Sequence, residues 1–205
     1  MVTIEKLMAL EKQHTEEEAR MLAPDDVSFL VDLLNEKDDK IRYAALLLLQ
    51  SRSTGFGDVY PYWGVFLQKL NSGNSYQRSI GLMLIAENAR WDAENRMEDA
   101  LDAFLGALRD EKPITVRQCI QALHRIIPYK SHLADKIADA LISLDIAKIR
   151  ETMQKSVLTD ILGVLGAIRK QQPSEKIDTY VFQALSGDIL DRKSKKDVEK
   201  MLAGN

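Results

Sequence analysis

The stretch FLVDLLNEKDDKIRYAALLLL, residues 29–49, joins two apolar segments through a short run of charged and amide residues. Three structures fit such a pattern: a membrane hairpin, part of a coiled coil, or one unit of a repeat. The longest uninterrupted apolar run, residues 44–49, has six residues, whereas roughly 20 are needed to cross a bilayer. Related stretches elsewhere in the chain decide between the other two structures.

The first half of this stretch has counterparts along the chain. Its pattern FLVDL begins at Phe29, and similar segments follow at intervals of 37, 38, 36 and 41 residues. These segments are FLQKL at 66–70, FLGAL at 104–108, ALISL at 140–144 and VFQAL at 181–185. Self-similarity at a nearly constant period is the sequence signature of a repeat architecture.

A basic residue followed by an apolar run marks the second half of each unit. The basic residues are Arg42, Arg78, Arg117 and Lys155, at intervals of 36, 39 and 38 residues. In the fourth unit Arg150, in KIRET, is an alternative landmark at an interval of 33. Two landmarks that recur in step at about the same period indicate a repeat more strongly than either does alone.

The second halves have the period of a helix. In the third unit the apolar residues are spaced three and four apart: Val116, Cys119, Ile120, Leu123, Ile126 and Ile127. Two residues after the basic landmark, the four units carry Ala44, Ile80, Cys119 and Val157. Six residues after it, they carry Leu48, Leu84, Leu123 and Ile161. These apolar columns predict that every unit buries the same face against its neighbours, as in a solenoid.

We therefore predict an all-α protein, a right-handed superhelix of about five helical hairpins that forms one repeat domain over residues 1–205. Residues 1–24 are predicted to form an N-terminal capping helix. The repeats are expected at about 25–54, 59–90, 94–129, 132–170 and 175–203. With only 10 glycines and 5 prolines, the chain has few turn-forming residues, which favours helices over many short strands.

Two stretches resemble HEAT repeats, which are related to armadillo repeats. They are DDKIRYAALLLL at 38–49 and PITVRQCIQAL at 113–123. The shared features are an F-L-x-x-L first helix, an acidic loop, and a Val or Ile before the arginine that opens the second helix. The resemblance covers residues 25–170, but Gln77 and Gln154 replace the Val or Ile in the second and fourth units.

The resemblance implies roles for the basic landmarks and for the second helices. Arg42, Arg78 and Arg117 would form a structural ladder that pairs with acidic loop residues. The acids nearest in sequence are Asp38, Asp39, Asp110 and Glu111. The second helices would line the concave face of the solenoid.

Positions of the second helices that face away from the apolar columns are candidates for binding a partner. These concave-face candidates are Tyr43, Gln50, Ser79, Arg90, Trp91, Gln118, Gln121, Arg125 and Tyr129. Tyr, Trp and Arg are enriched among residues that dominate binding energy. Any exposed helix face also needs polar residues, so simple solvation is the alternative at each position. Trp91 either packs under the next helix or is presented to a partner.

The sequence predicts no catalytic residues, no cofactor and no metal site. It contains no phosphate-binding glycine loop, no G-x-S-x-G elbow and no H-E-x-x-H motif. Cys119 is the only cysteine, so neither an intrachain disulfide nor a cysteine-based zinc site is expected. His14, His124 and His132 lack metal-ligand spacing, and His124 falls in an apolar column, where we expect it half-buried.

We expect a non-enzymatic interaction or scaffold module that binds a protein or peptide on its concave face. The alternative is a nucleic-acid-binding repair protein such as a HEAT-like DNA glycosylase, for which Trp63, Trp91 and Asp160 are candidate residues. The net charge of −3 argues against that alternative, because phosphate contacts dominate affinity for DNA. A helper of cofactor attachment, as in the HEAT-containing bilin lyases, has no motif in its support.

We expect a cytoplasmic protein without a membrane segment. Its first 20 residues are charged from Glu5 onward and lack the apolar run of a signal peptide. The sequence leaves open the identity of the partner and the oligomeric state.

Overall fold

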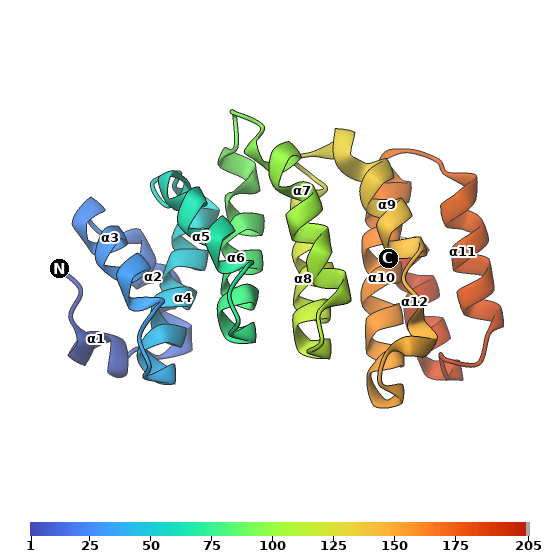
Figure 1. Ribbon diagram of the computed structural model, residues 1–205, viewed down its shortest axis with the longest axis horizontal. Helices are drawn as coiled ribbons and strands as arrows, with labels where there is room; N and C mark the ends of the chain where they lie inside the picture. Colours follow the sequence, from blue (N-terminus) through green and yellow to red (C-terminus); the bar gives the residue numbers. More distant parts are fainter. Residues whose placement is uncertain (204–205) are drawn as a thin grey trace. The chain divides into compact units, whose positions relative to one another are not determined.

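The computed structural model describes residues 1–203, and over this range all of its regular secondary structure is helical. It contains twelve α-helices and six short 3-10 helices, with no strand in the described residues (Figure 1). The predicted all-α class is therefore confirmed. The chain divides into two compact units, Met1–Ala100 and the residues from Leu101 onward.

The first unit packs its helices around α4. Its α-helices are α1 (Ile4–Met8), α2 (Thr15–Arg20), α3 (Pro24–Leu33), α4 (Asp39–Gly55), α5 (Trp63–Lys69) and α6 (Ser75–Asn88). Its 3-10 helices are η1 (Lys12–His14), η2 (Tyr60–Tyr62) and η3 (Ala89–Trp91). Helix α4 contacts α1, α2, α3 and α6, and α5 packs on α6.

The second unit packs its helices around α10. Helix α7 (Arg96–Gly106) runs into this unit, which continues with α8 (Pro113–Ile126), α9 (Ala134–Ile142), α10 (Glu151–Gln171), α11 (Glu175–Ser186) and α12 (Arg192–Ala203). Its 3-10 helices are η4 (Ala107–Arg109), η5 (Ser131–Leu133) and η6 (Ile146–Lys148). Helix α10 contacts α8, α9, α11 and α12.

The two apolar columns predicted from the sequence are buried in all four second helices. The column two residues after the basic landmark consists of Ala44, Ile80, Cys119 and Val157, and the column six residues after it of Leu48, Leu84, Leu123 and Ile161. All eight side chains are at most 7% exposed. The repeated positions therefore mark the buried faces of α4, α6, α8 and α10.

The positions at which the helices begin show which residue is the basic landmark of the fourth sequence repeat. Helices α4 and α6 begin three residues before Arg42 and Arg78, and α8 begins four residues before Arg117. Helix α10 begins four residues before Lys155, whereas Arg150 is its N-cap residue. Lys155 therefore has the equivalent position, and Arg150 belongs to the preceding loop.

The N-terminal capping segment differs from its prediction. Instead of one helix within residues 1–24, two short helices, α1 and α2, are separated by η1, and Glu11 has an extended backbone (φ −90°, ψ 140°). Both helices pack on α4, with Leu7 and Ala19 buried. The break allows two separate apolar side chains to reach the same neighbouring helix.

The predicted burial of His124 is wrong. Leu49, Ile85 and Leu162, which occupy the same column, are buried, whereas His124 is exposed. Helix α8 instead buries Ala122, five residues after its landmark, a position that is only half-buried in the other three second helices. Around these positions, the buried face of α8 is therefore rotated about the helix axis relative to the buried faces of α4, α6 and α10.

Candidate functional site

Arg42 and Arg78 have the same local structural role. The Nη1 of each donates to the carbonyl oxygen six residues earlier, Glu36 O and Ser72 O, at 2.8 Å in both cases. Arg42 also pairs with the Asp39 carboxylate. These carbonyls follow the ends of α3 and α5, so each arginine ties its loop to the start of the next helix.

Arg117 instead links two helices of the second unit. Its Nε lies 2.6 Å from Asp160 Oδ2 on α10, and its Nη2 lies 3.3 Å from Asp160 Oδ1. The hydrogen bond that Arg117 donates to the Asp160 carboxylate raises the pKa of the Arg117 guanidinium. Gln121 Nε2 donates to the same carboxylate at 3.2 Å. This network fixes the exposed side of α8 relative to α10.

Arg90 and Trp91, two of the concave-face candidates, are held against the C-terminal end of α4. The Trp91 indole Nε1 donates to Ser53 O at 2.7 Å, and Arg90 Nη1 donates to Thr54 O. A Cβ added at Gly57 would lie 3.3 Å from the indole ring. The indole is therefore packed rather than presented to solvent, but it packs against the end of α4 and Gly57, which precede it in the chain.

The other candidates in the first unit do not form a common surface patch. Tyr43 is 49% exposed, and Lys12 Nζ lies 5.7 Å from the centroid of its ring. Gln50 and Ser79 are half-buried. Only Tyr43 presents a large side chain to solvent here.

The second unit brings three candidates together in one exposed row. Gln121, Arg125 and Tyr129 are exposed and lie four residues apart at the C-terminal half of α8 and in the turn that follows it. Residues four apart share one side of a helix. We call these three residues the α8 stripe; Gln118, one turn earlier, is half-buried.

The residues considered for a glycosylase groove all have structural contacts. Trp63 is 2% exposed in the core and lies 5.7 Å from the Tyr60 ring. Trp91 packs on Gly57, and Asp160 is paired with Arg117. None of the three side chains is exposed.

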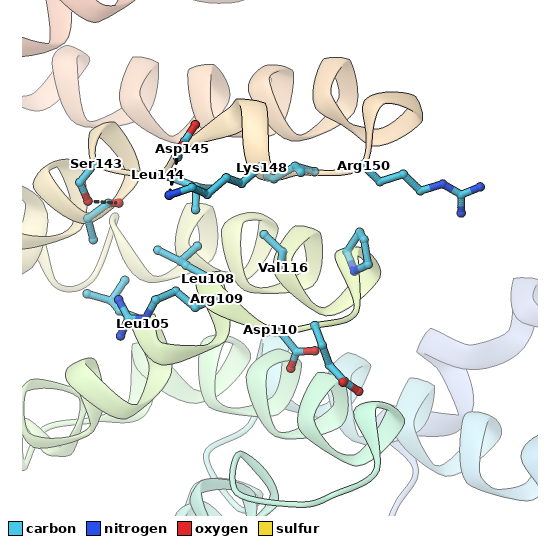
Figure 2. Close-up of a pocket in the computed structure, with 14 residues that line it drawn as sticks. Leu105, Leu108, Arg109, Asp110, Val116, Ser143, Leu144, Asp145, Lys148 and Arg150 are labelled. Carbon is cyan, nitrogen blue, oxygen red and sulfur yellow. Dashed lines mark hydrogen bonds and ion pairs between the residues drawn. The ribbon is translucent and has the colours of Figure 1, made fainter.

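A cavity in the second unit was not anticipated from the sequence. It has a volume of about 770 Å³ and lies between the loop that precedes α8 and the loop that precedes α10 (Figure 2). We call it the loop pocket. The loop between α9 and α10 has eight residues, 143–150, whereas the loops between α3 and α4 and between α5 and α6 have five each. The longer loop is the sequence signal that could have indicated it.

In the first unit, a buried lysine connects the equivalent regions, the loop that precedes α4 and the start of α6. Lys69 is 7% exposed, and its Nζ donates to Asn35 Oδ1 at 2.7 Å and to Gln77 Oε1. Gln77 Nε2 donates to Leu34 O at 2.8 Å. Burial lowers the pKa of the Lys69 ammonium, and the positive charge of Arg42 lowers it further.

Replacement of Lys69 by methionine is expected to change how stability depends on pH. The unfolded chain has the ordinary lysine pKa of 10.5 and therefore binds more protons than the folded protein as the pH rises towards that value. Wild-type stability should then rise with pH relative to the Lys69→Met variant. Urea unfolding of both proteins between about pH 7 and about pH 9.5 measures this difference. If the difference in unfolding free energy between the two proteins stayed constant over that range, folding would not lower the pKa of Lys69.

The described residues contain no cluster suited to a metal ion. No group of three or more His, Cys, Asp or Glu side chains with suitable geometry occurs within residues 1–203. Cys119 is buried, its thiol donates to Phe104 O at 3.4 Å, and burial raises its pKa. Across the same residues, no helix has both the length and the apolar character that a membrane crossing needs.

Comparison with known proteins supports the fold but gives no function. No family model matches the sequence, and no curated protein sequence matches it. Among solved structures, the chain is similar to an engineered protein whose crystal structure was determined by the Northeast Structural Genomics Consortium. The two share 17% sequence identity with a TM-score of 0.53, over 99% of this chain and 96% of that one. At this identity the similarity indicates a shared helical fold only.

Proposed function

We propose that the chain is a HEAT-like repeat protein, a right-handed solenoid of about five helical hairpins. Support comes from the two landmarks that recur in step and from the apolar columns that are buried in α4, α6, α8 and α10. In each of the two compact units, the second helices of neighbouring repeats also contact one another, α4 with α6 and α8 with α10. A single repeat of this kind buries its apolar face only by stacking on neighbouring repeats.

We further propose that it is a non-enzymatic cytoplasmic scaffold that binds a protein or peptide partner. The observation that carries this proposal is the α8 stripe, in which an amide and an arginine on one side of α8 and a tyrosine in the turn after it are exposed. Arg and Tyr combine apolar area with hydrogen-bonding groups and are enriched at the centres of interfaces. Because Arg117 and Gln121 both hold Asp160, the helix that carries the stripe is fixed before a partner binds.

Affinity capture from the native cell extract tests the proposal. We expect a partner bound by the wild-type protein to be lost from the double variant Arg125→Ala/Tyr129→Ala. The matched control is Thr179→Ala/Gln183→Ala, which truncates two exposed residues four apart on α11. The control should retain the partner. Loss of the partner from both variants, or from neither, would contradict binding through the α8 stripe.

The nucleic-acid alternative is tested with the same proteins. The net charge of −3 predicts no retardation of duplex DNA at moderate salt. Binding with a steep salt dependence would overturn the scaffold proposal, because such a dependence reports contacts to several phosphates.

A further inference from the structure

The loop pocket combines an apolar floor with a charged rim. The floor is formed by Leu105, Leu108, Val116, Leu144 and Ile149. Arg109 lies on one rim, and Lys148 and Arg150 belong to the loop opposite (Figure 2). A volume of about 770 Å³ is within the range of sites that bind ligands larger than a single side chain.

The identity of two residues explains why this space is open in the second unit. In the first unit Gln77, just before Arg78, reaches across to Leu34 O of the preceding loop. Val116 has the equivalent position before Arg117, and its side chain has no polar atom that could form such a bridge. Gln154, before Lys155, donates to Ile149 O of its own loop at 3.0 Å. The floor between the loops therefore consists of apolar side chains.

The acidic residues at the pocket already have partners close by. Asp145 Oδ1 accepts from Ala147 N at 3.1 Å, and its other oxygen lies 3.3 Å from Lys148 Nζ. Asp110 Oδ1 accepts from Lys112 N at 2.8 Å, and the Glu111 carboxylate lies 3.5 Å from Lys112 Nζ. Most of the negative charge at the rim is therefore balanced locally.

The two arginines of the pocket differ from these acids. Both are exposed, and within residues 1–203 neither the Arg109 nor the Arg150 guanidinium has a hydrogen-bond or ion-pair partner. Figure 2 shows them at opposite ends of the pocket, with Arg150 extending outward. An arginine offers a planar fork of donors that matches a carboxylate. The rim thus offers two cationic groups to a ligand, one on either side of an apolar floor.

We propose that the loop pocket binds a short peptide segment of a partner protein in which apolar side chains are flanked on both sides by Asp or Glu. The apolar side chains occupy the floor of leucines, and the flanking carboxylates pair with Arg109 and Arg150. Charge complementarity selects the acidic partner, and removal of apolar surface from water supplies affinity. This site is separate from the α8 stripe, because none of the three stripe residues lines the pocket.

Fluorescence anisotropy with capped, fluorescein-labelled hexapeptides tests the proposal on the full chain. The probe is Asp-Glu-Leu-Leu-Asp-Glu, and two comparison peptides separate the contributions. Asp-Glu-Ser-Ser-Asp-Glu keeps the charge without the apolar side chains, and Lys-Lys-Leu-Leu-Lys-Lys reverses the charge. We expect the probe to bind about tenfold or more tightly than either comparison peptide, and its affinity to fall with added salt.

Substitutions in the pocket assign the site. Arg109→Ser/Arg150→Ser should weaken binding of the probe by about fivefold or more, and Leu144→Ser should weaken it as well. Glu111→Gln should tighten binding, because it removes a like charge from the rim. The matched control is Arg192→Ser, which removes an exposed positive charge from α12 of the same unit, and binding should be unchanged.

Several outcomes would overturn the proposal. They are no binding of the probe, equal binding of either comparison peptide, or equal weakening by the Arg192 control. If dodecanoate displaced the labelled probe at a concentration equal to or lower than that needed of the unlabelled peptide, the pocket would instead be a site for a small amphipathic acid. Since Arg125→Ala/Tyr129→Ala leaves the pocket intact, that variant should bind the probe normally even if the stripe has no partner.

Discussion

Replacement of Arg52 by alanine is expected to destabilise the first unit by about 3 kcal/mol, because it breaks a buried ion pair and leaves its partners unsatisfied. Arg52, near the end of α4, is 7% exposed. Its Nη2 lies 2.7 Å from Asp58 Oδ2, and its Nε also bonds that carboxylate. Its Nη1 donates to Ala19 O at 3.1 Å and to Arg20 O at 3.0 Å, so one side chain joins α4, the following loop and the end of α2.

The size of this effect depends on which of the groups bonded to Arg52 can form hydrogen bonds with water once the guanidinium is removed. The Asp58 side chain is 31% exposed, so its carboxylate recovers part of its hydration, whereas the carbonyl of buried Ala19 does so less readily. This places the expected value at the low end of the 3–5 kcal/mol typical of broken buried pairs. The guanidinium also lies 3.6 Å from the centroid of the Phe56 ring, and that contact is lost too.

Urea unfolding of the wild-type protein and of two variants measures the effect. Arg20→Ala is the matched control: its side chain is 74% exposed and 3.9 Å from Glu16, so its removal should cost less than about 0.5 kcal/mol. Arg52→Lys should be intermediate, because an ammonium keeps the charge but loses the fork of donors. If Arg52→Ala cost no more than the Arg20 control, Arg52 would not hold the N-terminal helices on α4.

The helical architecture was predictable because its determinants are local and repeated. Ala44 and Ile80, 36 residues apart, occupy the same place relative to their arginines, and both are buried. A spacing of three and four residues identifies the buried side of a helix without any knowledge of its neighbour. The same reasoning failed at His124, because alignment to a column assumes that each helix has the same rotation.

The contacts that define the candidate surfaces were not predictable in the same way. The partner of Arg117 is Asp160, 43 residues later, although acidic loop residues lie much closer in the sequence. Trp91 resembled a binding residue, but its indole packs on Gly57 and donates to Ser53. Helical periodicity shows which residues share a face, but it does not show what another helix or loop places opposite that face.

Gly81→Ala is expected to destabilise the first unit by about 1–3 kcal/mol, the usual cost of overpacking, although alanine is intrinsically the better helix former by about 0.5–1 kcal/mol. Gly81 lies in the middle of α6, where this helix meets α5. A Cβ at Gly81 would lie 2.6 Å from Phe66 O and 3.0 Å from Leu70 Cδ2. The leucine can change its rotamer, but the Phe66 carbonyl belongs to the backbone of α5, and the Phe66 side chain is fully buried.

Gly64→Ala provides the matched control for this prediction, since Gly64 lies in α5 and a Cβ added there would meet nothing within 4 Å. We expect that variant to be unchanged or more stable by up to about 0.5–1 kcal/mol, following intrinsic helix propensity alone. Opposite changes in the free energy of unfolding for the two glycine substitutions, measured with urea, would separate the effect of close helix contact from that of helix propensity. If Gly81→Ala also stabilised the protein, α5 and α6 would have to be farther apart than the structure places them. Such a result would also question the burial of Lys69, which lies at the same contact, with its Cβ 3.2 Å from the position of the added carbon.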